Sequence, residues 1–305
     1  MRDVIIIGSG PAGMGAAIYG KRAGLNTLVL EGTGMSGGQV TQTYEVDNYL
    51  GLPGVNGFDM AMTFHAHLEK LGADFEMGEV TGIEKREKYF EVITSETSYK
   101  TKTVILATGA SHNKLGVPGE EELAGMGVSY CATCDGAFFR GKTTMVVGGG
   151  DVAIEDAIFL ARGCEKVYLV HRRDELRGAK ILQDRLMALP NVEIIWDSTV
   201  QEIQGVEQVE NIKLLNRKTG KESLIKADGI FIAVGIHPNT ENFNNLVEMD
   251  SQGYIMAGEN CETSMPGIFV AGDTRTKELR QIITAVADGA NAVNSVQKYL
   301  IHAGE

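Results

Sequence analysis

Two glycine-rich loops, 140 residues apart, constrain the fold of this chain more than any other feature. Each loop follows a short apolar run, 4–7 or 145–147, and precedes a stretch with helical spacing of small and apolar residues. The positions that recur are Gly8 as Gly148, Gly10 as Gly150, and Gly13 as Ala153. A Gly-x-Gly-x-x-Gly/Ala turn between a strand and a helix lets the backbone approach the pyrophosphate of a dinucleotide. The sequence therefore predicts two dinucleotide sites.

The repeat extends beyond the two loops. A second apolar run follows each predicted helix, at 27–30 and 166–170, and the residues just after these runs are Glu31 and His171, again 140 apart. Strand, helix and strand at this spacing form a βαβ unit. A single glycine motif is weak evidence, but two in register through the second strand are much stronger. We therefore predict an α/β fold with two Rossmann-like dinucleotide-binding domains.

Breaker-rich segments indicate how the two domains are connected. Residues 112–119 and 237–243 contain the His, Pro, Gly and Asn clusters typical of linkers. The second domain is therefore predicted to be inserted into the first, with boundaries at 1–114 and 244–305 for the outer domain and 115–243 for the inserted one. The last predicted helix has one apolar face, formed by Ile282, Val286, Gly289, Val293, Val296 and Leu300.

Composition excludes several classes of protein. No run of about 18 apolar residues is present, so a membrane span is not expected. The net charge of −12 argues against nucleic-acid binding, which needs a basic face. The apolar start is interrupted by Gly8–Ser9–Gly10 and resembles a first strand more than a secretory signal. We expect a cytoplasmic protein, in which a close cysteine pair is more often catalytic than structural.

The residue after each second strand indicates which nucleotide fits. Glu31 can accept hydrogen bonds from ribose hydroxyls and repels a 2′-phosphate, so the first site suits FAD or NAD. The second site has His171 followed by Arg172, Arg173 and Arg177. Arginines at this position can clamp a 2′-phosphate, which predicts NADPH, and on a helical turn the last two would share a face. The alternative is a solvated basic run at the start of a helix.

Cys131 and Cys134 form a Cys-X-X-Cys pair fourteen residues before Gly148. Such a pair can exchange electrons with a partner disulfide. A structural zinc site would need about four ligands, and neither a second pair nor a suitable histidine pair is present, so no metal is expected. A purely structural disulfide remains the alternative. Cys164 and Cys261 stand alone and are expected to be buried, inert thiols.

Over nearly its whole length the chain resembles the low-molecular-weight thioredoxin reductases of bacteria. Within the matching motifs, the string from Cys131 to Asp135 is the most specific. The related glutathione-reductase-type enzymes carry their disulfide in the FAD domain, whereas the matching segment here, 38–41, has no cysteine. The matching segments are 8–13, 37–39, 45–48, 131–136, 148–151, 171–177, 271–273 and 280–281.

The resemblance implies a thioredoxin-disulfide reductase that forms a homodimer. A hydride would pass from NADPH to FAD, and the electron pair would then pass to the Cys131–Cys134 disulfide and on to the disulfide of thioredoxin. One alternative is a flavoenzyme of the same build that reduces another redoxin or a small disulfide, or that uses a different electron donor. Another is a non-enzymatic nucleotide sensor, which the intact cysteine motif disfavours.

The resemblance also assigns site residues. FAD would be bound by Gly8, Ser9, Gly10, Pro11, Ala12, Gly13, Glu31, Gly38, Gln39, Asn48, Thr108, Gly109, Gly272, Asp273, Arg280 and Gln281. NADPH would be bound by Gly148, Gly150, Asp151, Ala153, Glu155, His171, Arg172, Arg173 and Arg177. Asp135 would be the general acid–base for Cys131 and Cys134, because an outgoing thiolate needs a proton and no histidine lies nearby in sequence.

Overall fold

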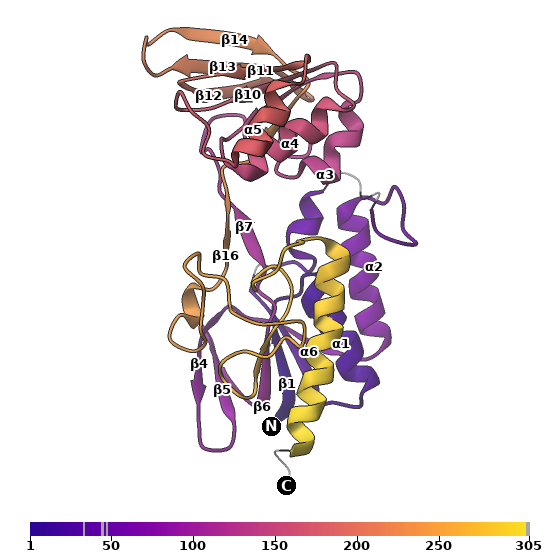
Figure 1. The fold of residues 1–305 in the computed structure, drawn as a ribbon. Helices are drawn as coiled ribbons and strands as arrows, with labels where there is room; N and C mark the ends of the chain where they lie inside the picture. The colour runs from indigo at the N-terminus through magenta and orange to yellow at the C-terminus, as the bar shows by residue number, and fades with distance from the viewer. Residues whose placement is uncertain (33, 44–45, 47, 303–305) are drawn as a thin grey trace. The chain divides into compact units, whose positions relative to one another are not determined.

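The computed structural model describes residues 1–32, 34–43, 46 and 48–302 of the chain (Figure 1). The chain packs into two units. The first unit consists of Met1–Thr41, Tyr49–Ser111 and His237–Glu305, and the inserted unit consists of Gln42–Asn48 and His112–Ile236. The sequence therefore leaves the first unit, builds the second, and returns to complete the first.

The first unit is built on a seven-stranded sheet of order β3-β2-β1-β6-β5-β4, in which β17 also pairs with β6. Strands β3, β2, β1, β6 and β17 are parallel to one another, whereas β5 and β4 extend the sheet with antiparallel pairing. The parallel strands carry continuous apolar runs because both of their faces are covered. The strands are β1 (Arg2–Ile7), β2 (Thr27–Glu31), β3 (Asp74–Met77), β4 (Val80–Lys85), β5 (Phe90–Thr94), β6 (Ser98–Leu106) and β17 (Ile268–Val270).

Helices cover one face of this sheet, and Figure 1 shows α1, α2 and α6 side by side. They are α1 (Pro11–Arg22), α2 (Gly57–Lys70) and α6 (Ile282–His302), with short 3₁₀ turns η1 (Gly38–Gln42) and η3 (Glu241–Phe243). The opposite face packs against β4, β5 and the segment around Phe243 and Ile255. On α6, Gly289, Val293 and Val296 are buried as predicted, but so is the charged Asp288.

The inserted unit has a five-stranded parallel sheet of order β11-β10-β9-β15-β8 and a separate antiparallel sheet, β12-β13-β14. Helices α4 and α5 cover one face of the parallel sheet, and the antiparallel sheet contributes to the core on the other. The strands are β8 (Val128–Ser129), β9 (Thr143–Val147), β10 (Lys166–Val170), β11 (Val192–Ile195), β12 (Ser198–Gly205), β13 (Val209–Asn216), β14 (Glu222–Lys226) and β15 (Gly229–Ile232). The helices are α3 (Ala132–Asp135), η2 (Gly136–Phe139), α4 (Asp151–Ala161) and α5 (Lys180–Met187).

The internal repeat predicted from sequence is present in the strand register. In the first unit, Ile7 of β1 pairs with Leu30 of β2, and in the inserted unit Val147 of β9 pairs with Val170 of β10. Both members of the second pair lie 140 residues after their counterparts. The closing strands repeat as well, because β6 lies beside β1 as β15 lies beside β9. The predicted α/β fold with two Rossmann-like units is confirmed.

Two short strands mark the places where the chain passes from one unit to the other. Strand β7 (Ala110–His112) pairs with β16 (Ile236–Pro238). The two units divide within this ribbon, after Ser111 and after Ile236. Among the described residues, no helix is both long enough and apolar enough to cross a membrane.

Candidate active site

The cysteine pair forms a disulfide at the start of a short helix. Cys131 precedes α3 in an extended conformation, and Cys134 lies within the helix, which places their Cα atoms 5.3 Å apart. The backbone N–H groups of Cys134 and Asp135 both donate to the carbonyl oxygen of Cys131. This single turn brings the two sulfur atoms within bonding distance.

Asp135 lies at the end of the same turn and has an unusual environment. Its Oδ2 accepts a hydrogen bond of 2.6 Å from the hydroxyl of Ser129, while its buried Oδ1 has no hydrogen-bond partner among the described residues. Burial raises the pKa of Asp135, and the hydrogen bond from Ser129 opposes the rise. A carboxyl group whose pKa is shifted towards neutrality is suited to give and take protons beside a thiol.

The strand before the disulfide is fixed by residues that the sequence motifs did not reveal. Ser129 also accepts a hydrogen bond from the backbone N–H of Cys131. Tyr130 donates from its hydroxyl to Glu120, a buried carboxylate that also accepts from the backbone of Leu115 and Gly116. Ser129 is two residues from Cys131 and could have been suspected from sequence, whereas the contact with Glu120 depends on the fold.

The three glycines of the first loop differ in how closely other atoms approach them. A Cβ at Gly8, where φ is +102°, would lie 2.4 Å from the carbonyl oxygen of Ala107, and one at Gly13 would lie 1.9 Å from the carbonyl oxygen of Gly8. A Cβ at Gly10 would meet no described atom within 4 Å. Gly8 and Gly13 therefore allow tight packing of strand and helix, while Gly10 leaves the N-terminus of α1 open to an anionic ligand.

Glu31 lies at the end of β2 and is buried beside this loop. Its Oε2 accepts hydrogen bonds from both the backbone N–H and the hydroxyl of Ser9, at 2.8 and 2.6 Å. The carboxylate thus orients the glycine loop in addition to lying where a ribose is expected. The sequence resemblance assigned Ser9 and Glu31 to FAD as separate residues, and in the structure they are hydrogen-bonded to each other.

Other residues predicted to bind FAD gather around the same loop. A Cβ at Gly38 would lie 3.5 Å from the Cα of Gly10, and Gln39 donates from its amide to the carbonyl oxygen of Ala110. The hydroxyl groups of Thr108 and Thr274 are 3.3 Å apart, which brings the turn at Thr108–Gly109 to that at Gly272–Asp273. Asn239, which sequence reasoning missed, accepts from Ser111 and donates to Thr108.

One predicted FAD residue, Asn48, comes from the 45–48 motif. Asn48 lies in the segment that groups with the inserted unit. Glu45 and Asp47, which belong to the same motif, lie outside the described residues.

Two buried polar atoms of the first unit lack a partner among the described residues: Oδ1 of Asp273 and Nε of Arg280. Burial raises the pKa of Asp273, and the positive charges of Lys277 and Arg280 oppose this. The guanidinium of Arg280 lies over the ring of Tyr254, 4.2 Å from its centroid. Arg280 and Gln281 immediately precede α6, which begins at Ile282. Buried groups of this kind are usually satisfied, so these residues fit a polar, anionic cofactor such as FAD.

The second glycine loop repeats this geometry. A Cβ at Gly148 would lie 2.4 Å from the carbonyl oxygen of Ala233, and one at Gly150 would meet no described atom within 4 Å. His171 is buried, and a Cβ at Gly149 would lie only 2.2 Å from its ring. Burial lowers the pKa of His171, and the nearby charges of Arg177 and Arg172 lower it further. Its buried Nε2 has no partner in the described part of the chain.

The arginine segment after His171 is a bent loop and not a helical turn. The backbone N–H of Arg177 donates to Gly149, and the N–H of Ala179 donates to the carboxylate of Asp151, so the loop is fixed against the glycine loop. The prediction of a shared helical face was wrong because these contacts override local helix formation; α5 begins only at Lys180. Asp151 therefore positions the arginine loop through its side chain.

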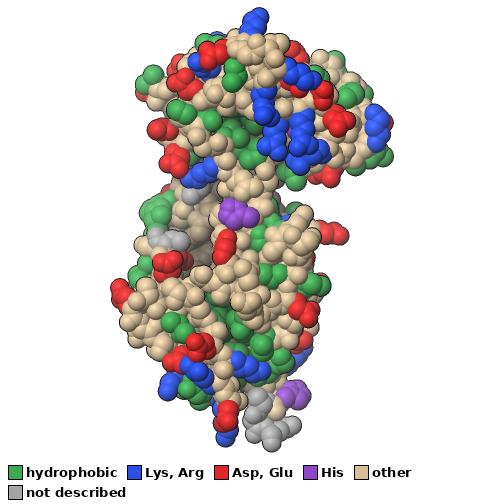
Figure 2. All heavy atoms as spheres, turned by 90° about the vertical axis from the view of Figure 1, so that its left-hand side faces the viewer, with side chains coloured by type: hydrophobic (Ala, Val, Ile, Leu, Met, Phe, Trp, Pro, Cys, Tyr) green, Lys and Arg blue, Asp and Glu red, His purple; other side chains and the backbone are tan. Residues whose placement is uncertain are grey.

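The three arginines of this loop are exposed, and Figure 2 shows Lys and Arg side chains gathered on the surface of the inserted unit. Within the described residues, none of the salt bridges involves Arg172, Arg173 or Arg177. Asp174, by contrast, pairs with Lys218 at 2.7 Å. Guanidinium groups without acidic partners fit a phosphate. Glu155, the predicted NADPH residue on α4, is also exposed.

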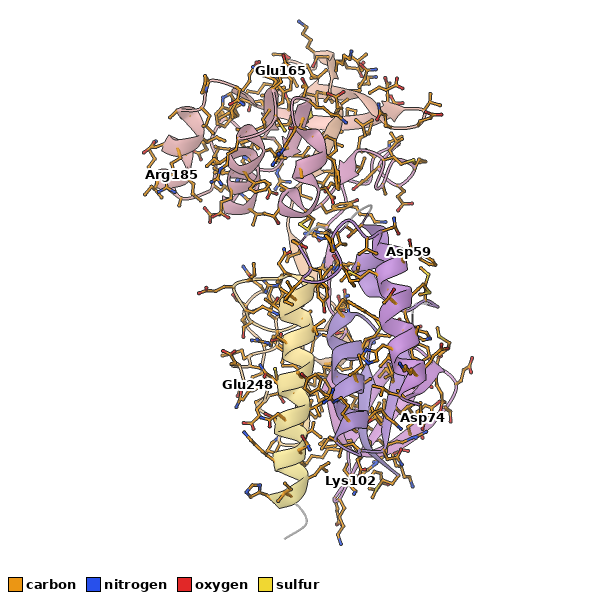
Figure 3. The ribbon with its side chains drawn as sticks, turned by 90° about the vertical axis from the view of Figure 1, so that its right-hand side faces the viewer. Asp59, Asp74, Lys102, Glu165, Arg185 and Glu248 are labelled. Carbon is orange, nitrogen blue, oxygen red and sulfur yellow. A yellow bond between two sulfur atoms is a disulfide. The ribbon has the colours of Figure 1, made fainter. Side chains whose placement is uncertain are left out.

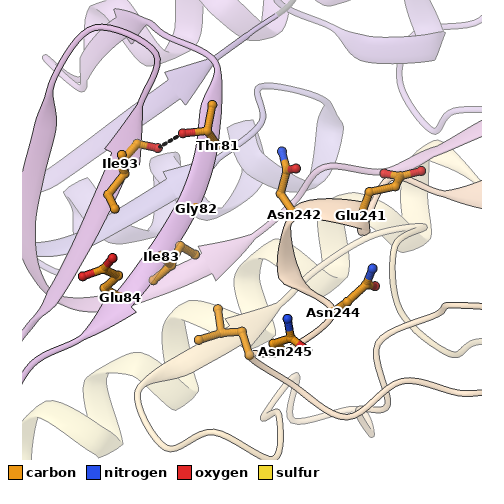
Figure 4. Close-up of a pocket in the computed structure, with 10 residues that line it drawn as sticks. Thr81, Gly82, Ile83, Glu84, Ile93, Glu241, Asn242, Asn244 and Asn245 are labelled. Carbon is orange, nitrogen blue, oxygen red and sulfur yellow. Dashed lines mark hydrogen bonds between the residues drawn. The ribbon is translucent and has the colours of Figure 1, made fainter.

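Two other features lie apart from these sites. The pocket in Figure 4 is lined by the β4–β5 hairpin and by polar residues around η3, and it contains no predicted site residue. Cys164 and Cys261 are buried free thiols, as predicted. Burial raises the pKa of Cys164, and it raises that of Cys261 to about 12, so neither is an effective nucleophile at neutral pH.

Comparison with known proteins assigns this arrangement to a class. The family of pyridine nucleotide-disulphide oxidoreductases matches residues 2–289, and the chain belongs to this family. It is 48% identical to the thioredoxin reductase of Listeria monocytogenes, over 98% of this chain and 93% of that protein. These similarities confirm the resemblance to the low-molecular-weight thioredoxin reductases of bacteria.

Solved structures agree with this assignment. The thioredoxin reductase of Streptococcus pyogenes matches with a TM-score of 0.95 and 48% identity, over 99% of both chains. A ferredoxin-flavin thioredoxin reductase from Clostridium acetobutylicum is more distant, with 31% identity and a TM-score of 0.53 over 98% of both chains. That similar protein is named for a different electron donor.

Proposed function

We propose that this oxidoreductase is an NADPH-dependent thioredoxin-disulfide reductase. In the balanced reaction, NADPH, a proton and oxidised thioredoxin give NADP⁺ and thioredoxin with two thiols. The observation that carries the proposal is the Cys131–Cys134 disulfide with the buried carboxyl of Asp135 on the same helical turn. FAD, when bound in the first unit, supplies the relay that accepts a hydride from NADPH and delivers an electron pair to this disulfide.

The inserted unit supplies the thiol chemistry. Two electrons and two protons convert the disulfide to the dithiol, and one thiolate then attacks a sulfur atom of the thioredoxin disulfide. The resulting mixed disulfide is resolved by the second cysteine, which releases reduced thioredoxin and re-forms the Cys131–Cys134 bond. Asp135 is the proton donor for an outgoing thiolate, and burial raises the pKa of its carboxyl group, which favours the protonated form.

The cysteine variants test this reaction directly. Thioredoxin-dependent oxidation of NADPH should fall below detection in Cys131→Ser and in Cys134→Ser, because one sulfur cannot carry the two-electron exchange. Cys164→Ser, which removes a buried free thiol, is the control and should keep the activity. Both cysteine variants should still consume NADPH with an artificial electron acceptor that bypasses the disulfide. Full thioredoxin reduction by either variant would remove the pair from the mechanism.

The choice of NADPH rests on the arginine loop. Two lost charge-assisted hydrogen bonds, each about 1.5–3 kcal/mol, should lower kcat/KM for NADPH by roughly 10²–10⁴ in Arg172→Ala/Arg173→Ala. The value for NADH should hardly change. Arg185→Ala, which removes an exposed arginine from α5, is the matched control. Equal losses with both nucleotides would contradict the assignment of this loop.

A second candidate function differs only in the electron donor. It is favoured by the match to the ferredoxin-flavin thioredoxin reductase. If the wild-type protein reduced thioredoxin with reduced ferredoxin but not with NADPH, this alternative would replace the first.

A further inference from the structure

The first unit contains a buried cluster of three charged side chains. Asp288 of α6 and Lys277 have side chains that are each only 6% exposed, and the side chain of Arg275 is 11% exposed. Two of the three charges are positive, so the cluster as a whole carries one positive charge. None of the three residues belongs to a glycine loop or to the cysteine motif.

Asp288 is the centre of this cluster. Its Oδ1 accepts from Nη2 of Arg275 at 2.7 Å, and its Oδ2 accepts from Nε of the same arginine at 2.9 Å. Oδ2 also accepts from Nζ of Lys277 at 2.8 Å and from the backbone N–H of Gly272 at 3.0 Å. Burial alone would raise the pKa of Asp288, but the hydrogen bonds from Arg275 and Lys277 outweigh it and keep the pKa below its usual value.

The backbone contact connects the cluster to the turn that carries Asp273. Gly272 has a φ of +82°, and a Cβ there would lie 2.8 Å from the Cβ of Ala12 on α1. Next to Asp288 on α6, a Cβ at Gly289 would lie 2.2 Å from the carbonyl oxygen of Ala12. The turn is therefore held between the first residues of α1 and the middle of α6. Asp288 is the side chain that ties it to α6.

Stability alone is a weak explanation for this cluster. Removing charges from water is costly, and replacing a buried ion pair with apolar residues is often neutral or even stabilising by about 1–4 kcal/mol. A buried network that converges on one backbone N–H does, however, fix the orientation of that backbone. The next residue, Asp273, has a buried Oδ1 with no partner among the described residues.

We propose that Asp288 is a positioning residue for FAD, which holds the Gly272–Asp273 turn in its binding conformation while Arg275 and Lys277 hold the Asp288 carboxylate in place. The inference rests on the proposed function, since it takes FAD as the ligand of the first unit. A turn fixed in advance lowers the entropy cost of binding, and a turn released from α6 restores that cost.

The test compares FAD binding by apoproteins with their thermal stability. Asp288→Ala should raise the Kd for FAD by roughly 10- to 100-fold, as expected for losing one hydrogen bond to a charged group together with the order of the turn. The affinity of the inserted unit for NADP⁺ should not change. The control is Asp3→Ala, which removes a carboxylate that accepts from Lys102 and from the backbone of Asn26. Lys102, the side chain that donates to Asp3, lies at the opposite end of the first unit from Asp59 at the start of α2 (Figure 3).

A second variant separates positioning from folding, because Asp288→Ala leaves two buried cations unpaired. Arg275→Met/Lys277→Met/Asp288→Val removes all three charges and should fold with a thermal midpoint close to that of wild type, yet bind FAD at least about tenfold more weakly. If this triple variant folds and binds FAD as tightly as wild type, the positioning role is overturned. If wild-type apoprotein itself fails to bind FAD, the proposed function is at fault.

Discussion

At the scale of single residues, the two copies of the repeat have different residues in contact at equivalent positions beside the glycine loop. Ser9 and Glu31 form a hydrogen-bonded pair in the first unit. Their counterparts 140 residues later are Gly149 and His171, where the imidazole ring fills the space that a Cβ of residue 149 would need. The larger side chain at 171 therefore requires glycine at 149, although this glycine is not one of the motif positions.

Neighbouring glycines of the second loop should separate folding from binding. Gly149→Ala forces the ring of His171 to move and should lower the free energy of unfolding by about 1–3 kcal/mol, the usual cost of overpacking. Gly150→Ala has no described atom within 4 Å of the new Cβ, so its stability should hardly change while its affinity for NADP⁺ falls. Urea unfolding and nucleotide titration of the two variants check this. Equal stabilities would contradict the packing argument.

The sequence predicted those site residues that are close together in the chain. The glycine loops, the cysteine pair and the neighbouring Asp135 are local patterns whose residue types follow from their chemistry. Asn239 and Asp288 were not predicted because their roles depend on contacts with Thr108 and Gly272, which are distant in sequence. A charged residue close to the apolar face of a helix, as Asp288 is on α6, is a signal that could have drawn attention to it.

At the scale of elements, strands and helices were easier to predict than the loop at 171–179. The strands follow from apolar runs, and the helices from their spacing. The arginine loop contains residues that favour a helix, but its backbone hydrogen-bonds to Gly149 and Asp151 instead. These partners belong to the start of α4, so no local rule could have indicated this conformation.

Helix α4 carries a half-buried carboxyl group that makes the stability of the protein depend on pH. Burial raises the pKa of Asp156 to about 7, and the charge of Glu155 contributes to the rise. In the unfolded chain an aspartate has a pKa of about 3.9, so the folded state holds this proton more tightly and loses stability as the pH rises from that value through 7. The charged form of Asp156 is thus unfavourable at pH 8.

Replacing Asp156 with asparagine should remove this effect. The free energy of unfolding of Asp156→Asn relative to wild type should increase between pH 5 and pH 8, by at least about 1.4 kcal/mol, the value of one pKa unit. Urea unfolding at the two pH values measures the difference directly. A difference that stays constant, or that is larger at pH 5, would contradict the raised pKa.

At the scale of the whole molecule, two separate pairs of hydrophobic clusters stabilise the two units. Each unit has its own sheet and its own glycine loop. The sequence predicted this division from the repeat, whereas the pairing of β7 with β16, where the chain passes between the units, has no local residue pattern.

Separate cores predict separate responses to ligands. FAD should raise the midpoint of one thermal transition and NADP⁺ that of the other, each by the equivalent of about 2.7 kcal/mol at a ligand concentration of 100 times Kd. Scanning calorimetry of the apoprotein with each ligand alone measures the effect. If either ligand shifted both transitions equally, the two units would have to unfold as one.

The insertion of one unit into the other also determines when the protein can become complete during synthesis on the ribosome. Residues 112–236 emerge as a continuous stretch and can form their own sheet, whereas β6 must wait for β17, and α1 for α6. Domains generally fold as units while the chain is still being made. The turn at Gly272–Asp273 is therefore translated after the whole inserted unit, and the first unit is completed only after the inserted unit has emerged.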